Sequence, residues 1–462
     1  MTLIRSISGI RGTIGGRPGE GLSPLDIVRY TAAFGTLIRQ RSGKTAPRLV
    51  LGRDARLSGP MVADLVRGTL VGLGFEVIDL GLATTPTVEM AVPGEAADAG
   101  IILTASHNPK QWNALKLLNG RGEFISAADG AEVLRIAGQD DYSFADVDRL
   151  GRVRTDDGWT RRHIDAILRL DLVDAAAIAA RRYTVVVDAV NSVGGVAVPL
   201  LLEALGVAVV KLHCEPNGHF PHNPEPLPEH LTDLCAKVVE QKAHLGISVD
   251  PDVDRLALVC EDGSLFGEEY TLVACADHVL AHRPGDTVSN LSSTRALHDV
   301  AARHGRTRHA SAVGEVNVVE RMREVNAPIG GEGNGGVILS ELHHGRDALV
   351  GIALFLTLLA RRGGSCLELR RSYPDYFISK NKIELRPDVD VQAIVNAVQA
   401  RYADQPHSTV DGLRIEFGNT WVHLRRSNTE PIIRVYAEAP SMPQADELAR
   451  RFMREVEGWV GG

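Results

Sequence analysis

Several features that would place the chain in a specialised class are missing. Its five cysteines form no CxxC pair and are odd in number, so we expect reduced thiols rather than a disulfide framework. A formal net charge of -8 gives no general basic surface, and neither nucleic acid nor a membrane is expected as a partner. The longest apolar run, residues 348–360, is too short to span a bilayer and predicts a buried helix. Residues 1–6 lack the apolar core of a signal peptide, which favours a cytoplasmic protein.

One pattern of secondary structure recurs three times along the 462 residues. Each round is a short apolar strand, a polar turn, a helical stretch that ends at a glycine, and a second strand. The rounds begin at residues 48–52, 183–187 and 286–291. Strands that alternate with helices at this spacing predict βαβ units on a largely parallel sheet. From residue 382 the pattern changes to strand, helix, strand, strand, helix, which predicts a small α+β domain.

A chain of this length is expected to hold three or four domains. We predict three similar mixed α/β domains followed by a C-terminal α+β domain. The predicted boundaries give residues 1–153, 154–254, 255–369 and 370–462. Each of these domains contains one loop whose residues are suited to chemistry.

The first loop, residues 104–109, reads Thr-Ala-Ser-His-Asn-Pro and follows an apolar strand at 99–103. A serine on a loop after a buried strand can act as a nucleophile or carry a covalent group. An ordinary polar turn is the alternative, since Ser, Asn and Pro are all turn residues. A hydrolase dyad of Ser106 with His107 is disfavoured, because adjacent side chains in extended backbone point in opposite directions.

The second loop, residues 250–255, reads Asp-Pro-Asp-Val-Asp-Arg and lies between two apolar strands. Asp250, Asp252 and Asp254 are expected to project to one side of an extended segment. Their mutual repulsion favours a hard divalent cation as their partner. With Glu261 they also match four positions of a calcium-binding loop. That interpretation fails, because an arginine stands where the calcium loop needs glycine and an apolar strand follows.

The third loop, residues 330–336, reads Gly-Gly-Glu-Gly-Asn-Gly-Gly and contains the spacing GxGxxG. In a dinucleotide-binding turn a helix must follow these glycines directly. Here residues 337–339, Val-Ile-Leu, predict a strand instead. We therefore reject a dinucleotide site.

The fourth loop, residues 425–431, reads Arg-Arg-Ser-Asn-Thr-Glu-Pro between two predicted strands. A guanidinium, hydroxyls and the backbone N–H groups of a tight turn suit a phosphate dianion. Taken alone, this loop indicates only a basic hairpin turn.

The four loops occur in the order found in the α-D-phosphohexomutase superfamily, and the whole chain resembles that family. The first two resemble its phosphoserine and metal loops. The third resembles its sugar loop, with Asn334 in place of the usual serine and Gly336 in place of the usual histidine. These departures resemble an archaeal-like branch of the family. The fourth resembles its phosphate loop, with Asn428 where glycine is commoner, and residues 8–13 and 313–317 resemble two further family motifs.

The resemblance implies a role for individual residues. Catalytic roles are implied for Ser106, Lys116, Arg11, His107 and Arg255. Substrate binding is implied for Glu332, Asn334, Gly333, Glu315, Arg425, Ser427, Asn428, Thr429 and Arg434. The implied ligands of a Mg²⁺ ion are Ser106, once phosphorylated, and Asp250, Asp252 and Asp254.

The family moves a phosphoryl group between the C1 and C6 oxygens of a hexose. The resemblance therefore implies four loops around a central cleft that binds a hexose phosphate. Phosphorylated Ser106 would form a hexose 1,6-bisphosphate, which also primes the serine. The sugar loop favours phosphoglucosamine mutase, while the phosphate loop is also seen in phosphomannomutase/phosphoglucomutases. A sugar-phosphate-binding protein without turnover and a phosphatase are the alternatives from other classes, and the chain is expected to be a monomer or homodimer.

Overall fold

The computed structural model describes residues 2–6, 9–385, 390–426 and 432–460. The chain forms two compact units, residues 1–271 with 335–367 and residues 272–334 with 368–462. All five cysteines are free. Within the described ranges, none of the helices combines the length and the apolar content that a membrane crossing requires.

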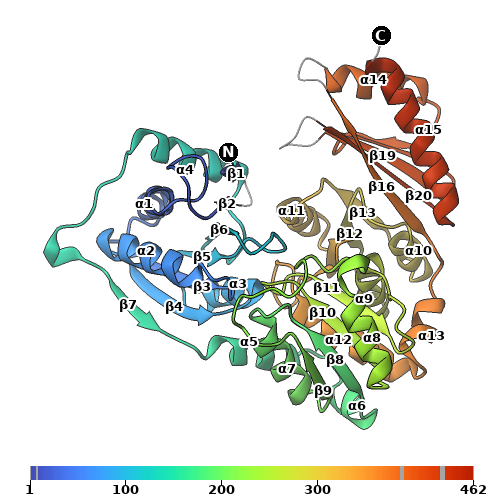
Figure 1. Ribbon diagram of the computed structural model, residues 1–462, viewed down its shortest axis with the longest axis horizontal. Coiled ribbons are helices and arrows are strands. Elements are labelled where there is room, and N and C mark those ends of the chain that lie inside the picture. The colour runs from blue at the N-terminus through green and yellow to red at the C-terminus, as the bar shows by residue number, and fades with distance from the viewer. Residues whose placement is uncertain (1, 7–8, 386–389, 427–431, 461–462) are drawn as a thin grey trace. The chain divides into compact units, whose positions relative to one another are not determined.

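The first unit begins with a seven-stranded mixed sheet of order β1-β2-β6-β5-β3-β4-β7 (Figure 1, blue and teal). Its strands are β1 Ile4–Ser6, β2 Gly9–Thr13, β3 Arg48–Arg53, β4 Glu76–Leu82, β5 Ala99–Leu103, β6 Trp112–Asn119 and β7 Arg152–Thr155. β5, β3, β4 and β7 run parallel, which confirms the first predicted βαβ unit. β1, β2 and β6 are antiparallel to their neighbours, so the sheet is less parallel than expected.

Helices cover both faces of this sheet. They are α1 Pro24–Ser42, α2 Gly59–Gly72, α3 Thr85–Gly94 and α4 Ala127–Gln139. α1, α2 and α4 share one apolar core with the sheet, while α3 packs in a separate core that includes Trp159. The start of α1 is fixed by Ser23, whose side chain and that of Asp26 form a capping box. The carboxyl ends of β3 and β5 lead into loops.

The second sheet has the order β11-β10-β8-β9. Its strands are β8 Thr184–Asp188, β9 Ala208–Leu212, β10 Leu245–Val249 and β11 Leu256–Cys260. The helical segments around it are α5 Trp159–Leu168, α6 Ala175–Ala180, α7 Gly194–Ala204, η2 Pro228–His230 and α8 Thr232–Glu240, while η1 Val147–Arg149 lies beside α2 of the first sheet. β8, α7 and β9 confirm the second βαβ unit. β11 pairs with β10 around the acidic loop, so this sheet continues beyond residue 254, where a domain boundary was predicted.

The first unit also contains β15 Gly336–Leu339 and the helix α12 Ala348–Arg362. Asp347 caps α12 by accepting the N–H group of Leu349 at 2.8 Å. Residues 348–359 of α12 are buried, as the apolar run in the sequence predicted.

The second unit contains a parallel sheet with the strand order β13-β12-β14. Its elements are β12 Thr287–Asn290, α10 Ala296–Arg303, β13 Arg308–Ser311, α11 Glu315–Val325 and β14 Ile329–Glu332. The third predicted βαβ unit is therefore confirmed. Two helices have residues in both units, α9 Glu268–His282 and α13 Cys366–Arg371.

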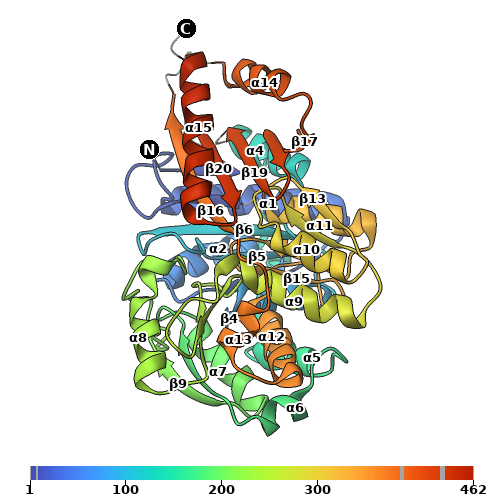
Figure 2. The ribbon, with the colours of Figure 1, turned by 90° about the vertical axis from the view of Figure 1, so that its right-hand side faces the viewer.

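The C-terminal part of the second unit is an antiparallel sheet of order β16-β20-β19-β18-β17. Its elements are β16 Phe377–Glu384, α14 Val391–Arg401, β17 His407–Ser408, β18 Leu413–Phe417, β19 Thr420–Arg426, β20 Ile432–Ala439 and α15 Met442–Val460. Figure 2 shows α15 lying along this sheet, where Phe452 and Val456 enter the apolar core. The predicted α+β character is confirmed, but β17 and β18 were missed and β16 begins before residue 382.

Candidate active site

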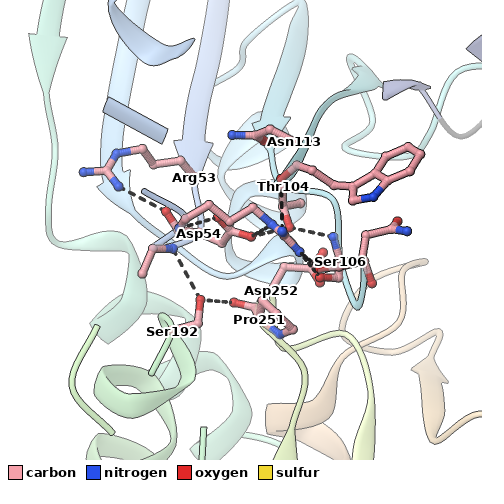
Figure 3. Close-up of polar contacts among 12 residues, drawn as sticks. Arg53, Asp54, Thr104, Ser106, Asn113, Ser192, Pro251 and Asp252 are labelled. Atoms are coloured by element: carbon pink, nitrogen blue, oxygen red, sulfur yellow. Dashed lines mark hydrogen bonds and ion pairs between the residues drawn. The ribbon is translucent and has the colours of Figure 1, made fainter. Parts of the chain in front are cut away.

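Ser106 lies in the loop that follows β5, and its hydroxyl faces the acidic loop of the second sheet. The Ser106 Oγ donates a hydrogen bond to Asp250 Oδ2 at 2.8 Å. Its backbone N–H donates to Thr104 Oγ1 at 2.9 Å, and the residue is 9 % exposed. Figure 3 shows Ser106 close to Asp252 of the acidic loop. The fold thus brings together a serine and an aspartate that are 144 residues apart in the sequence.

The backbone at Ser106 is left-handed, with a φ of 49°, rather than extended. The prediction that Ser106 and His107 point in opposite directions is therefore wrong. His107 Nδ1 lies 3.4 Å from Ser106 Oγ, although the bond from this hydroxyl to Asp250 is shorter. Burial, followed by the charge of Arg255, lowers the pKa of His107 to about 2. His107 is thus a neutral hydrogen-bonding group beside the serine at pH 7.

Asp250, Asp252 and Asp254 converge as expected. One carboxylate oxygen from each lies within 4.8 Å of the others, and all three residues are buried. The loop is not extended, however, because Val253 has a φ of 65°, which is strained for a β-branched residue. The backbone N–H groups of Asp254 and Arg255 donate to Asp250 Oδ1 at 3.1 and 3.2 Å. A buried turn, rather than a strand, therefore brings the carboxylates together.

Three cationic side chains surround these carboxylates. Lys116 Nζ lies 2.7 Å from Asp252 Oδ2 and 3.5 Å from Asp254 Oδ2. Arg346 donates to Asp254 Oδ2 at 2.7 Å, and Arg255 Nε lies 3.9 Å from Asp254 Oδ1. Buried carboxylates are tolerated when opposite charges are this close.

Burial and the neighbouring charges shift the pKa values of the cluster in different directions. Burial raises the pKa of Asp250, and its two neighbouring aspartates raise it further. Burial would also raise the pKa of Asp254, but Arg346 and two other cations leave that pKa below its usual value. For Lys116, burial lowers the pKa, yet the carboxylates of Asp252 and Asp254 more than offset this and leave it raised. Lys116 therefore keeps its proton.

Two oxygens of the cluster accept no hydrogen bond from the part of the chain that the structure describes. They are Asp252 Oδ1 and Asp254 Oδ1, and both are buried. A buried carboxylate oxygen without a partner is costly, and oxygen ligands of this kind are those that hard divalent cations prefer. The acidic loop therefore fits a metal ion such as Mg²⁺, which these aspartates would hold.

Arg11 lies in β2, opposite Ala114 of β6. Its Nε has no hydrogen-bond acceptor among the described residues, and burial lowers its pKa. Its charge is one of those that lower the pKa of His107. A guanidinium with an unused donor near the serine loop suits an anion, as its predicted role at the phosphoryl group requires.

The predicted sugar-binding residues belong to the second unit. Glu332 ends β14 and is buried, and its Oε1 accepts hydrogen bonds from Asn290 Nδ2 at 2.9 Å and from the Gly314 N–H at 3.0 Å. Glu315, which is also buried, is the first residue of α11. Gly333 and Asn334 follow Glu332 in the chain. The strand β15 comes directly after these glycines, so the local structure differs from a dinucleotide-binding turn.

Two arginines predicted to bind phosphate at the fourth loop, Arg425 and Arg434, lie within the described residues. Arg425 Nη1 lies 3.3 Å from Asp411 Oδ2, and the same oxygen accepts the Val313 N–H at 3.0 Å. Arg434 is paired with Arg425 across β20 and β19. Asp411 thus connects the end of β19 to the segment that contains Glu315. Three predicted residues lie outside the described ranges: Ser427, Asn428 and Thr429.

Arg346 was not among the residues predicted from the sequence. It precedes the N-cap of α12 and is 8 % exposed, yet it makes the shortest cationic contact with Asp254. An arginine beside a helix start has no chemical pattern of its own, and its contact with Asp254 spans 92 residues. Only the fold reveals this part of the site.

We expect Arg346→Met to destabilise the metal-free protein. The charged hydrogen bond to Asp254 is worth roughly 1.5–3 kcal/mol. The loss should be smaller in excess Mg²⁺, because a bound cation would supply positive charge to the same carboxylate. Denaturant unfolding of both proteins, in chelator and in Mg²⁺, measures the difference.

Arg361→Met is the matched control, because Arg361 pairs with Asp174 at 3.1 Å near the other end of α12, with both side chains partly exposed. Such a surface pair is worth about 1 kcal/mol or less. Equal losses for Arg346→Met in chelator and in Mg²⁺ would contradict the expected link between Arg346 and the cation.

The comparisons with known proteins agree with this arrangement. Models of the three α/β/α domains and the C-terminal domain of phosphoglucomutase/phosphomannomutase match residues 3–143, 161–263, 267–376 and 384–455, in that order. The chain belongs to the phosphoglucomutase/phosphomannomutase family. The resemblance inferred from the loops is thereby confirmed, and the protein is a phosphohexomutase, an isomerase of the phosphotransferase type.

Individual relatives cover the chain almost completely. The phosphohexomutase is 36% identical over 455 residues to a phosphoglucomutase/phosphomannomutase of Thermococcus kodakarensis, covering 98% of this chain and 99% of that protein. It is 32% identical over 459 residues to a probable phosphoglucosamine mutase of Methanopyrus kandleri, covering 98% and 97%. A crystal structure of a phosphoglucomutase/phosphomannomutase family protein from Burkholderia thailandensis matches with a TM-score of 0.85 at 27% identity, covering 98% of both chains.

Proposed function

We propose that this phosphohexomutase interconverts the 6-phosphate and the 1-phosphate of glucosamine, through a phosphoserine at Ser106 and a hexose 1,6-bisphosphate. The observation that carries the phosphoserine mechanism is the hydrogen bond from Ser106 Oγ to Asp250. It places the serine at a buried group of three carboxylates and three cations, where a phosphoryl group can be held and its charge balanced.

The protein residues can account for the proton movements of each transfer. The phosphoryl group passes from Ser106 Oγ to a free hydroxyl of the bound sugar phosphate, and the serine oxygen needs a proton as it leaves. Lys116, which keeps its proton, can supply it and then take the proton that the sugar hydroxyl releases. The guanidinium groups of Arg11 and Arg255 would bind the equatorial oxygens of the phosphoryl group. A Mg²⁺ ion held by Asp250, Asp252, Asp254 and the phosphoserine would neutralise the charge that builds up on that group.

The remaining predicted residues would bind the sugar phosphate. The buried Glu332 carboxylate suits ring hydroxyls and the amino group of glucosamine. Gly333 and Asn334 follow it in the chain, and Glu315 follows Gly314, whose N–H donates to Glu332. Arg425 and Arg434, together with Ser427, Asn428 and Thr429, would bind the phosphate that is not reacting. After one transfer the bisphosphate would turn around inside the closed site, where water cannot intercept the phosphoryl group.

We also propose that four domains carry these four groups of residues. The first boundary is better placed after Thr155, because β7 belongs to the first sheet, and the third stays near residue 369. The second is better placed after Cys260, because β10 and β11 are hydrogen-bonded strands of one sheet.

The second candidate is phosphomannomutase/phosphoglucomutase activity. It is favoured by the 36% identity to the Thermococcus kodakarensis protein of that name. Glucose and mannose carry a neutral hydroxyl at C2, where glucosamine carries an amino group that is largely protonated at neutral pH, so the charge near Glu332 would differ between these substrates.

A panel of glucosamine, glucose and mannose phosphates, assayed with Mg²⁺ and a trace of hexose 1,6-bisphosphate, tests the proposal. We expect kcat/KM for glucosamine 6-phosphate to exceed the others by at least about tenfold. Faster turnover of glucose or mannose phosphates would support the second candidate instead. Release of inorganic phosphate at a rate similar to isomer formation would indicate a phosphatase.

Arg425→Ala should act mainly on KM. The phosphate that is not reacting is bound equally in the ground state and the transition state, so loss of its partner is a loss of uniform binding. At roughly 1.5–3 kcal/mol for a charged hydrogen bond, KM should rise by about one to two powers of ten. Some loss of kcat is also expected, because remote binding energy helps to position the sugar.

Steady-state kinetics, beside an assay of Ser106 phosphorylation by a bisphosphate donor, measures both effects. Arg450→Ala, on an exposed position of α15, is a suitable control. An unchanged KM together with loss of Ser106 phosphorylation would place Arg425 at the reacting phosphate and would refute its assigned role.

A further inference from the structure

Arg56 is a completely buried arginine that is not among the predicted catalytic, substrate-binding or metal-binding residues. It lies in the polar turn between β3 and α2, and its side chain is 0 % exposed. Its Nε donates to Asp54 Oδ2 at 3.0 Å, and the ring of Phe220 lies 5.1 Å from its guanidinium carbon. The charge is therefore compensated locally, but two of its three nitrogens remain for other contacts.

Those two nitrogens bind the serine loop. Backbone carbonyl oxygens of four residues in or beside that loop accept hydrogen bonds from Arg56: Ser106, Asn108, Pro109 and Trp112. Nη2 binds the first two, with 2.6 Å to Asn108, and Nη1 binds the others at 2.8 and 3.0 Å. A guanidinium has five N–H donors, and here each of the five has an acceptor. No other common side chain offers that number of donors in a fixed plane.

This contact bears directly on the backbone of Ser106. Left-handed backbone is unfavourable for a residue other than glycine, so other interactions must maintain the φ of 49° at Ser106. Arg56 donates to the backbone carbonyl of Ser106, and the backbone N–H of Ser106 donates to Thr104 Oγ1. Thr104 Oγ1 in turn donates to Asp54 at 2.7 Å, so both contacts lead to the same buried ion pair.

The same turn is also tied to the acidic loop (Figure 3). The N–H of Ala55, next to Arg56, donates to Ser192 Oγ at 3.3 Å. Ser192 Oγ donates to the carbonyl of Pro251 at 2.7 Å. One short segment, residues 54–56, thus binds the serine loop directly and is connected to the loop of three aspartates through Ser192.

We propose that Arg56 is a positioning residue for phosphoryl transfer, which sets the placement of Ser106 Oγ relative to Asp250 by binding the four carbonyls of the serine loop. The proposal rests on the proposed role of Ser106 as the phosphoryl carrier. A displacement of about 1 Å in a reacting group can cost on the order of a hundredfold in rate. Arg56 therefore acts on the rate of the chemical step without touching the substrate.

Arg56→Lys tests this with the least disturbance. Lysine keeps the positive charge beside Asp54 but has only three donors, so it cannot bind all four carbonyls. The dephosphorylated protein is mixed with an excess of labelled glucose 1,6-bisphosphate and Mg²⁺, and phosphorylation of Ser106 is followed in a single turnover. In that step a phosphoryl group leaves the sugar for Ser106 Oγ, and the serine proton passes to the sugar oxygen.

The rate constant and the amplitude separate positioning from a folding defect. A smaller folded fraction would lower the amplitude at an unchanged rate constant, whereas a misplaced Ser106 should lower the rate constant about a hundredfold at full amplitude. Arg67→Lys is the control, because Arg67 pairs with Asp64 and Asp79 on the same domain and does not contact the serine loop. A wild-type rate constant in Arg56→Lys would overturn the proposal.

A second variant covers the case in which Arg56→Lys does not fold. The pair Asp54→Asn with Arg56→Gln removes both buried charges together, so neither is left uncompensated, and it also removes most of the donors to the loop. The same loss of rate constant is expected. If the unmodified protein takes no phosphate on Ser106, the proposed function fails. If the unmodified protein is phosphorylated and the variants have the same rate constant, only the proposed role of Arg56 fails.

Discussion

Ser106→Ala is expected to reduce mutase turnover by at least about 10⁴-fold. In the proposed mechanism the Ser106 hydroxyl carries the phosphoryl group between the two sugar oxygens, and alanine has no oxygen that could do so. The fold supports this, since Ser106 Oγ is held 2.8 Å from Asp250 and a left-handed backbone turns it towards His107. A coupled assay of isomer formation measures the loss.

Mass measurement of the freshly prepared protein should show one phosphate that maps to Ser106 and is missing in Ser106→Ala. Ser126→Ala is a useful control, because Ser126 caps α4 by accepting the N–H of Asp129 at 3.2 Å. Its loss should cost about 1 kcal/mol of stability without affecting turnover. Full activity in Ser106→Ala would exclude a phosphoserine mechanism.

The serine and acidic loops could be found in the sequence because their chemistry is local. A serine after a buried strand and three alternating aspartates between two strands can be recognised without any long-range contact. Their detailed geometry could not be found in the same way. Extended backbone was assumed for both, and both turn through a left-handed residue, Ser106 in one and Val253 in the other. Neither residue type favours that conformation, so only tertiary contacts produce it.

The residues that support these loops were not recognised at all. Arg56 was included in an ordinary polar turn, and its acceptors lie some fifty residues further along the chain. Ser192 lies in the corresponding turn of the second βαβ unit and contacts Pro251. Backbone carbonyls have no sequence signature, so an arginine that binds them looks like any other arginine.

The same distinction between local and long-range signals explains the outcome for the fold. The three βαβ units were predicted because each repeats a strong strand and helix pattern. In the C-terminal sheet, β17 has only two residues, and β18 contains two charged residues among its five. Arg414 of β18 is buried all the same, because it donates to the Leu291 carbonyl within the second unit. Contacts with distant residues thus stabilise a strand whose own sequence pattern is weak, and that pattern does not reveal those contacts.

Asp252→Asn should lower the rate on the order of a thousandfold, because it removes one charge and one metal ligand while it keeps the shape of the side chain. Asp252 Oδ2 already accepts hydrogen bonds from Thr85 Oγ1 at 2.6 Å and from Lys116 at 2.7 Å. Its buried Oδ1 has no donor among the described residues, which makes it a strong candidate to bind the cation. An amide oxygen at that position is a weaker ligand than a carboxylate.

Measuring kcat across a range of Mg²⁺ concentrations separates the two consequences of Asp252→Asn. Weaker Mg²⁺ binding should raise the Mg²⁺ concentration at half-maximal activity. The missing negative charge should lower kcat even when Mg²⁺ is saturating. Asp262→Asn, in the exposed turn after β11, controls for a general loss of negative charge. If Asp252→Asn has the kcat and the Mg²⁺ dependence of the unmodified protein, or if excess chelator leaves that protein fully active, the acidic loop does not hold a catalytic metal. The three aspartates would then serve as charge and hydrogen-bond partners of the protein's own groups, which include Ser106, Thr85 and the three cations.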